Sequence, residues 1–198
     1  MTATIRVAIA AAALCLTAGA ASAACRAPAA ADDLTTDQAA QLYDCLKGDM
    51  QAGYAKGPKR WIPEGYVADY RGWTQASVAP AAPGPHGDRF LMTWVNAAGT
   101  DAYLEFADEN VVIPAGTVIA KESFDVRPDG IAAPGPLFFM EKVAAGTSSV
   151  TNDWFYMMVS PAGVPQAVDV VAGCHACHEN YADQGNLGYP DEDVRASR

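Results

Sequence analysis

The pentapeptide Cys-His-Ala-Cys-His at residues 174–178 constrains this chain more than any other part of its sequence. Thiols one helical turn apart can each add to a vinyl group of a porphyrin, and the next histidine can reach the iron. A thioredoxin-like redox pair would instead stand at the first turn of a βαβ unit. A structural zinc site needs four ligands, and apart from His175 and His178 the chain has only one further histidine, His86. We therefore predict one covalently attached haem c, with Cys174 and Cys177 as thioether donors and His178 as the proximal iron ligand.

Residues 1–23 have the composition of a secretory signal peptide. Arg6 precedes an apolar run of small residues that ends in Ala-Ser-Ala at positions 21–23, a sequence of the kind that signal peptidase cleaves. A membrane anchor is the alternative, but the run is mostly alanine and has no aromatic residues. We expect cleavage after Ala23, a periplasmic mature protein with no membrane attachment, and a single domain over residues 24–198.

The cysteine count of 5 falls to 4 when Cys15 leaves with the signal peptide. Besides the two cysteines of the pentapeptide, Cys25 and Cys45 remain, and an oxidising compartment favours their pairing. A disulfide between them closes a loop of about 20 residues, which stabilises a fold by roughly 3 kcal/mol on a chain-entropy estimate. We predict this disulfide; two free thiols are the alternative.

The charge of the chain excludes several classes of partner. Lys+Arg number 13 against Asp+Glu 23, and loss of Arg6 takes the net charge from -10 to -11. An acidic chain without a basic run has no electrostatic footprint for nucleic acid or anionic lipid. A small redox protein that accepts electrons from this chain is expected to be basic. The hydrophobic content of 51% predicts a packed core.

The first half of the chain predicts one long helix. Thr35 and Gln38 have the spacing of a capping box, and apolar residues recur at three- and four-residue steps to about Tyr54. An irregular, Pro- and Gly-rich connection follows, with one short strand expected near residues 66–70.

The second half predicts strands and then a helix. Strands are expected at residues 89–96, 117–126, 136–143 and 154–160, with a helical turn or two within 97–106. The connections between the last three strands are too short for crossover helices, so these strands are antiparallel. A helical stretch from about Gln166 carries the haem motif, with His175 exposed and idle inside it. The predicted fold class is α+β: a mainly antiparallel β-sheet flanked by helices, with a C-terminal haem-attachment helix.

Residues 114–122, Pro-Ala-Gly-Thr-Val-Ile-Ala-Lys-Glu, resemble the Gly-Thr-Val-x-x-Lys-Glu signature of the cytochrome P-460 family, which includes the related cytochromes c′-beta. The family's other landmarks follow in order: Phe-Phe-Met at 138–140, Asp-Trp-x-Tyr at 153–156, the haem motif, Ala-Asp at 182–183, Tyr-Pro at 189–190 and Arg195. The resemblance covers roughly Arg89 to Arg198, while residues 24–88 fit only loosely.

This resemblance implies a periplasmic c-type cytochrome that is commonly a homodimer. In the enzymatic members, the lysine of the signature is bonded to a meso carbon of the haem, and a five-coordinate iron oxidises hydroxylamine to nitric oxide or nitrous oxide. The matching residue is Lys121. Judged from the strand alone, Lys121 shares a face with Ile119, Ser123 and Asp125, and an ordinary lysine on a solvated face is the alternative.

The enzymatic members also use a distal carboxylate that takes protons from the substrate. Here a non-acidic residue, near Thr147, stands where that acid is expected. Glu141 is the nearest acid and our candidate base, and Glu122 adjoins Lys121; for both, a solvated sheet edge is the alternative. A missing general base costs about 10²–10⁴-fold in rate.

Three functions therefore stay open. The first is an oxidoreductase of hydroxylamine or nitric oxide, using a small nitrogen-oxide substrate and a small redox protein as electron acceptor. The second is a non-enzymatic binder of nitric oxide or carbon monoxide, as in the cytochromes c′-beta. The third is a simple electron-transfer cytochrome whose iron takes a methionine as sixth ligand. The candidates for that ligand are Met92, Met140, Met157 and Met158.

Overall fold

The computed structural model describes residues 24–197, so the predicted signal peptide of residues 1–23 lies outside the described residues. The strands are β1 (Thr74–Gln75), β2 (Phe90–Val95), β3 (Val118–Val126), β4 (Ala132–Lys142) and β5 (Trp154–Val159). The α-helices are α1 (Thr36–Tyr54), α2 (Glu64–Asp69), α3 (Pro85–Asp88), α4 (Thr100–Tyr103) and α5 (Ala176–His178). A π turn covers Val171–His175, and short 3-10 turns cover Ala31–Asp33, Tyr70–Gly72, Ser149–Thr151, Glu179–Gln184 and Glu192–Val194. Within residues 24–197, no helix has both the length and the hydropathy to cross a membrane.

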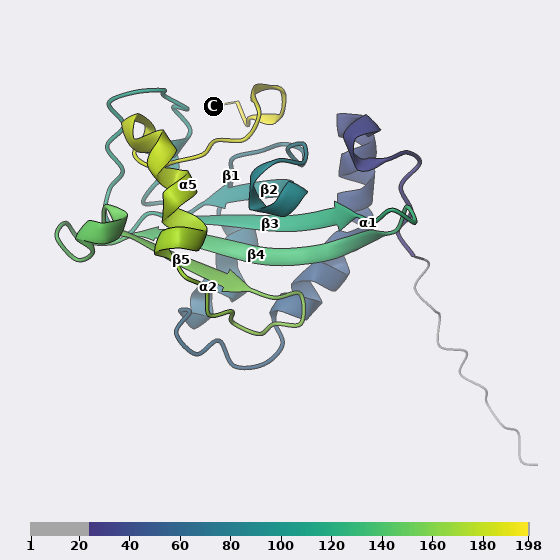
Figure 1. Ribbon diagram of the computed structural model, residues 1–198, viewed down its shortest axis with the longest axis horizontal. Helices are drawn as coiled ribbons and strands as arrows, with labels where there is room; N and C mark the ends of the chain where they lie inside the picture. Colours follow the sequence, from purple (N-terminus) through teal and green to yellow (C-terminus); the bar gives the residue numbers. More distant parts are fainter. Residues whose placement is uncertain (1–23, 198) are drawn as a thin grey trace, which may run out of the picture.

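The five strands form one sheet in the order β1-β2-β3-β4-β5, and all neighbouring strands are antiparallel (Figure 1). This confirms the predicted α+β class. β4 begins at Ala132, four residues before the expected start, although Pro134 and Pro136 lie within it. Proline cannot donate to a strand ladder and therefore marks a strand boundary in a sequence. Here a register shift between β3 and β4 accommodates both prolines, and the Ser123 hydroxyl donates to the Pro136 carbonyl at 2.6 Å.

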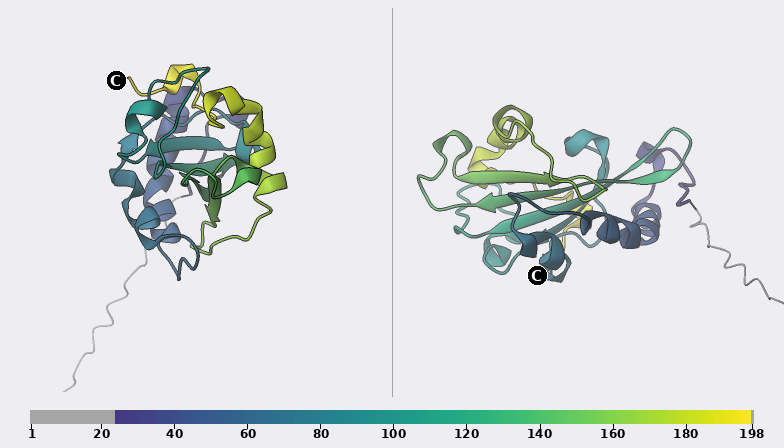
Figure 2. Two further views of the ribbon diagram at one scale, coloured as in Figure 1. Left: turned by 90° about the vertical axis from the view of Figure 1, so that its left-hand side faces the viewer. Right: turned by 90° about the horizontal axis from the view of Figure 1, so that it is seen from below.

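The two faces of the sheet carry different layers, as the right-hand view of Figure 2 shows, with α1 on one side and the C-terminal helical segment on the other. The face beneath α1 and α2 is the main core. Its buried strand residues are Phe90, Met92, Trp94, Val118, Ala120, Phe124, Ala132, Leu137, Phe139, Met157 and Val159. The opposite face contributes Val95, Ile119, Met140, Trp154 and Tyr156 to a second, smaller core. Alternate strand residues thus separate a mainly structural face from the face beneath the haem motif.

Helix α1 confirms the predicted helix and its capping box. The Thr35 hydroxyl accepts from the Gln38 amide at 3.3 Å, and the Gln38 side chain accepts from the Thr35 amide at 2.9 Å. Leu42, Leu46 and Met50 are buried and form the stripe that packs on the sheet. The helix therefore begins where its N-terminal amides are satisfied and is held by one apolar face.

A disulfide joins Cys25 to Cys45, as predicted, with their Cα atoms 5.9 Å apart. It fastens the N-terminal segment to the middle of α1. The same segment pairs with the hairpin between β3 and β4, where Arg26 and Ile131 form an antiparallel bridge. The disulfide thus links the helix layer to one end of the sheet.

The short strand predicted near residues 66–70 is wrong, because this segment is helix α2 followed by a 3-10 turn. Tyr66 and Tyr70 both pack against Phe139, with ring centroids 5.7 and 6.0 Å away. Residues four apart share a face in a helix as well as in a strand, so the aromatic spacing did not separate the two structures. Pro63 immediately before the helix and Glu64 in its first turn are typical of a helix start.

Candidate haem site

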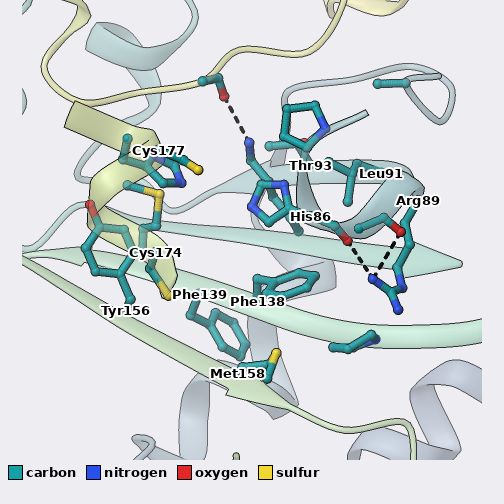
Figure 3. A pocket seen from close by; sticks show the side chains of 18 of the residues that line it. His86, Arg89, Leu91, Thr93, Phe138, Phe139, Tyr156, Met158, Cys174 and Cys177 are labelled. Carbon is teal, nitrogen blue, oxygen red and sulfur yellow. Dashed lines mark hydrogen bonds between the residues drawn. The ribbon is translucent and has the colours of Figure 1, made fainter. Parts of the chain in front are cut away.

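A cavity of about 870 Å³ lies between the second face of the sheet and the C-terminal segment that contains the haem motif (Figure 3). This volume lies within the range of about 300–1,000 Å³ that is usual for ligand and cofactor sites. Most of the wall is apolar. The chemically active side chains in it are His86, Arg89, Lys121, Tyr156, Cys174, Cys177, His178 and Asp191.

The helical stretch that carries the haem motif begins at Val171, five residues later than predicted. Gln166 instead extends the sheet edge, because its amide donates to the Met158 carbonyl at 2.8 Å. The helical turns start only after Asp169, whose carboxylate accepts from the amides of Val171 and Ala172 at 3.1 and 3.0 Å. This side chain acts as an N-terminal cap, which the sequence prediction did not use.

Cys174 and Cys177 are free thiols, and both line the cavity. Burial raises the pKa of Cys174, whereas a redox-active thiol of the thioredoxin type has a lowered pKa. Among residues 24–197, no three His, Cys, Asp or Glu side chains are grouped so as to hold a metal ion.

His178 lies on α5, is buried, and is oriented by Asn186. The His178 Nδ1 lies 2.9 Å from the Asn186 carbonyl, which can only accept, so this nitrogen is the protonated one and donates. The Asn186 side chain in turn donates to the His178 carbonyl at 3.2 Å. Burial and the charge of Lys121 lower the pKa of His178 to about 4. A neutral ring with Nδ1 satisfied leaves Nε2 free to bind a metal, and this orientation through a second residue is typical of metal-ligating histidines.

The expectation that His175 is exposed is wrong. Its side chain is 5% exposed, and its Nδ1 lies 3.0 Å from the Tyr156 hydroxyl. The π turn directs the residue between the two cysteines toward the sheet instead of toward solvent. His175 thereby anchors the motif to β5.

Lys121 enters the same cavity from β3. Its side chain is buried, and its Nζ donates to the Gly188 carbonyl at 2.9 Å. It stands opposite Thr93 on β2 and Phe138 on β4. Burial lowers the pKa of Lys121 to about 8, so a sizeable fraction of the amine is neutral near physiological pH. A lysine on a solvated face is therefore the wrong interpretation.

The structure does not bring Glu141 to the cavity. Glu141 is half-buried on β4, shares its strand face with Phe139, and lies by Tyr66 of α2. Burial, followed by the charge of Glu141, raises the pKa of Tyr66 to about 12. Thr147, near which an acid was sought, lies in an exposed turn outside the cavity.

Glu122 also faces away from the cavity, because it follows Lys121 directly in a strand. It is 1% exposed, so it does not lie at a solvated edge. Its carboxylate accepts from the Tyr43 hydroxyl at 2.6 Å, from the Tyr70 hydroxyl, and from Arg71, whose Nη2 lies 2.5 Å away. Glu122 thus belongs to a buried polar cluster under α1.

Met140 and Met158 line the cavity from its own face of the sheet. Met157 borders the cavity, but it pairs with Phe139 and its side chain lies in the main core on the other face. Met92 belongs to the main core on the other face of the sheet.

Sequence reasoning missed a role for His86 and Arg89. His86 lines the cavity from α3, and Arg89 lines it from the position directly before β2. The His86 ring lies 4.8 Å from the Phe138 ring and 6.1 Å from the His178 ring, measured between centroids. Pro85 and Gly87 flank His86 and are the one sequence signal that could have drawn attention to it, because such a tripeptide marks a constrained turn.

The cavity residues fit a haem. The apolar wall suits a macrocycle, the two thiols line the same cavity, and His178 offers a neutral nitrogen. Arg89 and Lys121 supply positive charge that carboxylate substituents require. The residues that would hold the group are therefore Cys174, Cys177 and His178.

Comparison with known proteins agrees with this geometry. The family model described as Cytochrome P460 matches residues 67–187, which is more than half of the chain and includes Lys121, Cys174, Cys177 and His178. No curated protein sequence matches the chain significantly. The matched family implies a haem cofactor with its iron. The chain belongs to the cytochrome P460 family.

Proposed function

We propose that the protein is an exported c-type cytochrome that oxidises hydroxylamine at one haem, held by Cys174, Cys177 and His178. The position of Lys121 carries this proposal, because its amine enters the cavity that the two thiols and His178 line. Burial of a lysine costs free energy, and among residues 24–197 no carboxylate lies within ion-pair distance of this amine. A functional use of the amine accounts for keeping it there.

When bound, haem would supply a redox-active iron that can bind a small nitrogen ligand. Oxidation of hydroxylamine to nitric oxide releases three electrons and three protons. The electrons must leave for a small redox protein, and the net charge of -10 favours a basic one. The protons must pass to groups at the cavity wall.

Lys121 suits a covalent bond between its Nζ and a meso carbon of the haem. This bond removes one hydrogen from each partner and is a two-electron oxidation, so hydrogen peroxide as the oxidant would be reduced to two molecules of water. The reacting amine must be neutral, and a pKa of about 8 makes that form accessible. The Gly188 carbonyl fixes the direction of the amine.

A gas-binding haem protein without this bond is the second candidate, favoured by the scarcity of acids at the cavity. Asp191 is the only carboxylate residue that lines it in the described part of the chain. Asp191 is exposed, and its Oδ2 accepts from the Ala82 amide at 3.2 Å. With few acids at the cavity, proton removal from bound hydroxylamine would be slow and oxidation inefficient. The protein would then act as a binder of nitric oxide or carbon monoxide.

Peptide mapping of the purified holoprotein tests the proposal. We expect a tryptic fragment that contains haem, the peptide of Cys174 and Cys177, and the peptide of Lys121, together with a red-shifted ferrous absorption band and hydroxylamine-dependent reduction of an electron acceptor. Lys121→Met should keep the thioether bonds and lose the other signals. Recovery of Lys121 only in a haem-free peptide would refute the cross-linked enzyme and make the gas binder the leading function.

Export and assembly are part of the proposal. The disulfide between Cys25 and Cys45 supports an oxidising compartment, which for this chain we propose to be the periplasm. Recovery of the holoprotein in the periplasmic fraction, starting at Ala24, tests this. The homodimer that the resemblance implies stays a prediction, and light scattering of the holoprotein measures it.

A further inference from the structure

His86 is the second histidine whose ring faces the candidate haem site. It enters the cavity from the loop around α3, on the opposite side from the segment that carries His178 (Figure 3). Its ring centroid lies 6.1 Å from that of His178, with an angle of 67° between the two planes.

This separation suits two imidazoles that share one metal ion. A metal-bound imidazole nitrogen lies about 2 Å from its metal and the ring centre roughly 1 Å further, so two such rings on opposite sides have centres about 6 to 6.5 Å apart. A hydrogen-bonding residue that left room for a ligand between itself and the iron would have to lie further away. The distance therefore favours ligation over a purely second-sphere role.

The backbone holds His86 in an unfavourable conformation. His86 has φ 72° and ψ 30°, in the left-handed region that non-glycine residues seldom adopt, and Gly87 follows with φ 79°. Such a residue is strained and persists where its surroundings impose it, often at functional sites.

Arg89 is the group that imposes this conformation. Its Nη1 donates to the His86 carbonyl at 2.6 Å and to the Gly87 carbonyl at 3.3 Å. Gly87 has a φ of 79°, which L side chains rarely adopt, so this turn favours glycine. The loop is therefore built to present one imidazole to the cavity.

The chemical state of the ring also suits a ligand. The His86 Nδ1 is buried and has no hydrogen-bond partner among the described residues. A buried imidazole nitrogen without a hydrogen-bond partner is free to serve as a ligand.

We propose that His86 occupies the axial position opposite His178 in the resting protein, and that a small ligand binds only after His86 has left it. This inference rests on the proposed haem site at His178 and names the group that controls access to it. Ligand exchange changes no oxidation state. The protein would thus be six-coordinate at rest and five-coordinate only transiently.

The spin state of the ferric holoprotein tests this directly. We expect the wild type to be low-spin by electron paramagnetic resonance, with the near-infrared magnetic circular dichroism of two imidazole ligands. His86→Asn should become high-spin while keeping the loop, because asparagine tolerates a positive φ. Met140→Leu and Met158→Leu are matched controls, because they remove the other candidate ligands of the same cavity, and both should stay low-spin.

Ligand kinetics give a second readout. Carbon monoxide binding to the ferrous wild type should saturate with concentration at the rate of His86 release, whereas His86→Asn should bind at a rate linear in concentration. If His86 occupies the iron 90–99% of the time, its loss tightens apparent ligand affinity by about 10- to 100-fold.

The outcomes separate the two proposals. A high-spin wild type, or a His86→Asn variant that remains low-spin, overturns the role of His86. If that variant yields no holoprotein, the ligand signature of the wild type decides alone, and any set other than two imidazoles refutes the inference. A bis-imidazole protein that never oxidises hydroxylamine keeps His86 in place and refutes only the proposed enzymatic function.

Discussion

Lys121 and Glu122 are neighbours in the chain, yet their side chains lie on opposite faces of the sheet. The amine of Lys121 enters the haem cavity, and the carboxylate of Glu122 lies in the buried cluster with Tyr43, Tyr70 and Arg71. Because adjacent strand residues alternate, an acid next to the lysine cannot serve the same site. Variants on the two faces should therefore have separable effects.

Arg71→Met should destabilise the protein strongly while leaving the haem spectrum unchanged. It removes the cation from a carboxylate whose side chain is 0% exposed, and breaking a buried pair in this way costs about 3–5 kcal/mol. Urea denaturation measures the loss. Lys47→Met is the matched control, because Lys47 pairs with Asp44 at the exposed surface, where such a pair contributes about 0–1 kcal/mol. Equal losses in the two variants would contradict the prediction.

Stability should fall above pH 10. Burial and the charge of Glu122 raise the pKa values of Tyr43 and Tyr70 in the folded state, whereas unfolded tyrosine titrates near 10. The contribution of these two tyrosines to the free energy of unfolding is complete below pH 10. It declines above pH 10, because there the tyrosine hydroxyls lose their protons only in the unfolded state. The slope reaches about 1.4 kcal/mol per pH unit for each tyrosine. Denaturation of wild type and Tyr70→Phe between pH 9 and 11.5 measures it, and the variant should show the shallower decline.

Asn186→Gly and Asn186→Ala should separate two roles of this residue. Asn186 has φ 65° and donates its side-chain amide to the His178 carbonyl. Glycine keeps the positive φ and removes the two side-chain bonds, the one to the His178 carbonyl and the one accepted from Asn152. Alanine also strains the backbone, at a cost of about 1–3 kcal/mol. Both changes, made in the His86→Asn variant so that the iron is five-coordinate, should shift the iron–histidine stretch in resonance Raman spectra. Alanine should lower the free energy of unfolding further. An unchanged stretch in both would show that the Asn186 side chain does not position His178.

The double variant Cys25→Ser/Cys45→Ser should unfold more easily by roughly 3 kcal/mol, since the cross-link closes a loop with a sequence separation of 20. The haem spectrum should not change, because neither residue lines the cavity. Mass mapping without reductant should detect the linked peptides in the wild type. Two unlinked peptides would contradict the bond.

Local sequence patterns predicted the helix and the strands whose residues carry those patterns. The capping box at Thr35 gave the start of α1, and alternation with short turns gave the antiparallel order of β3, β4 and β5. Prediction failed where two structures share a spacing, as for Tyr66 and Tyr70, or where a proline such as Pro134 lies inside a strand.

The site could be predicted only in part, because its residues meet through tertiary structure. The motif and Lys121 were identifiable from their sequence context. The face of the sheet on which the Glu141 side chain lies depends on the register of β4. The contact by which Asn186 orients the His178 ring depends on the turn after α5. His86 lies 92 residues before His178 in the chain, and no local pattern expresses that proximity.

The sheet also separates the residues that determine function from those that determine stability. Substitutions around the cavity on one side can alter redox chemistry, ligand preference or access while the ion pair, aromatic packing and disulfide on the other side continue to hold the fold. A lineage with this architecture can therefore change its reaction without first acquiring extra stability, because the two properties reside in different layers of one sheet.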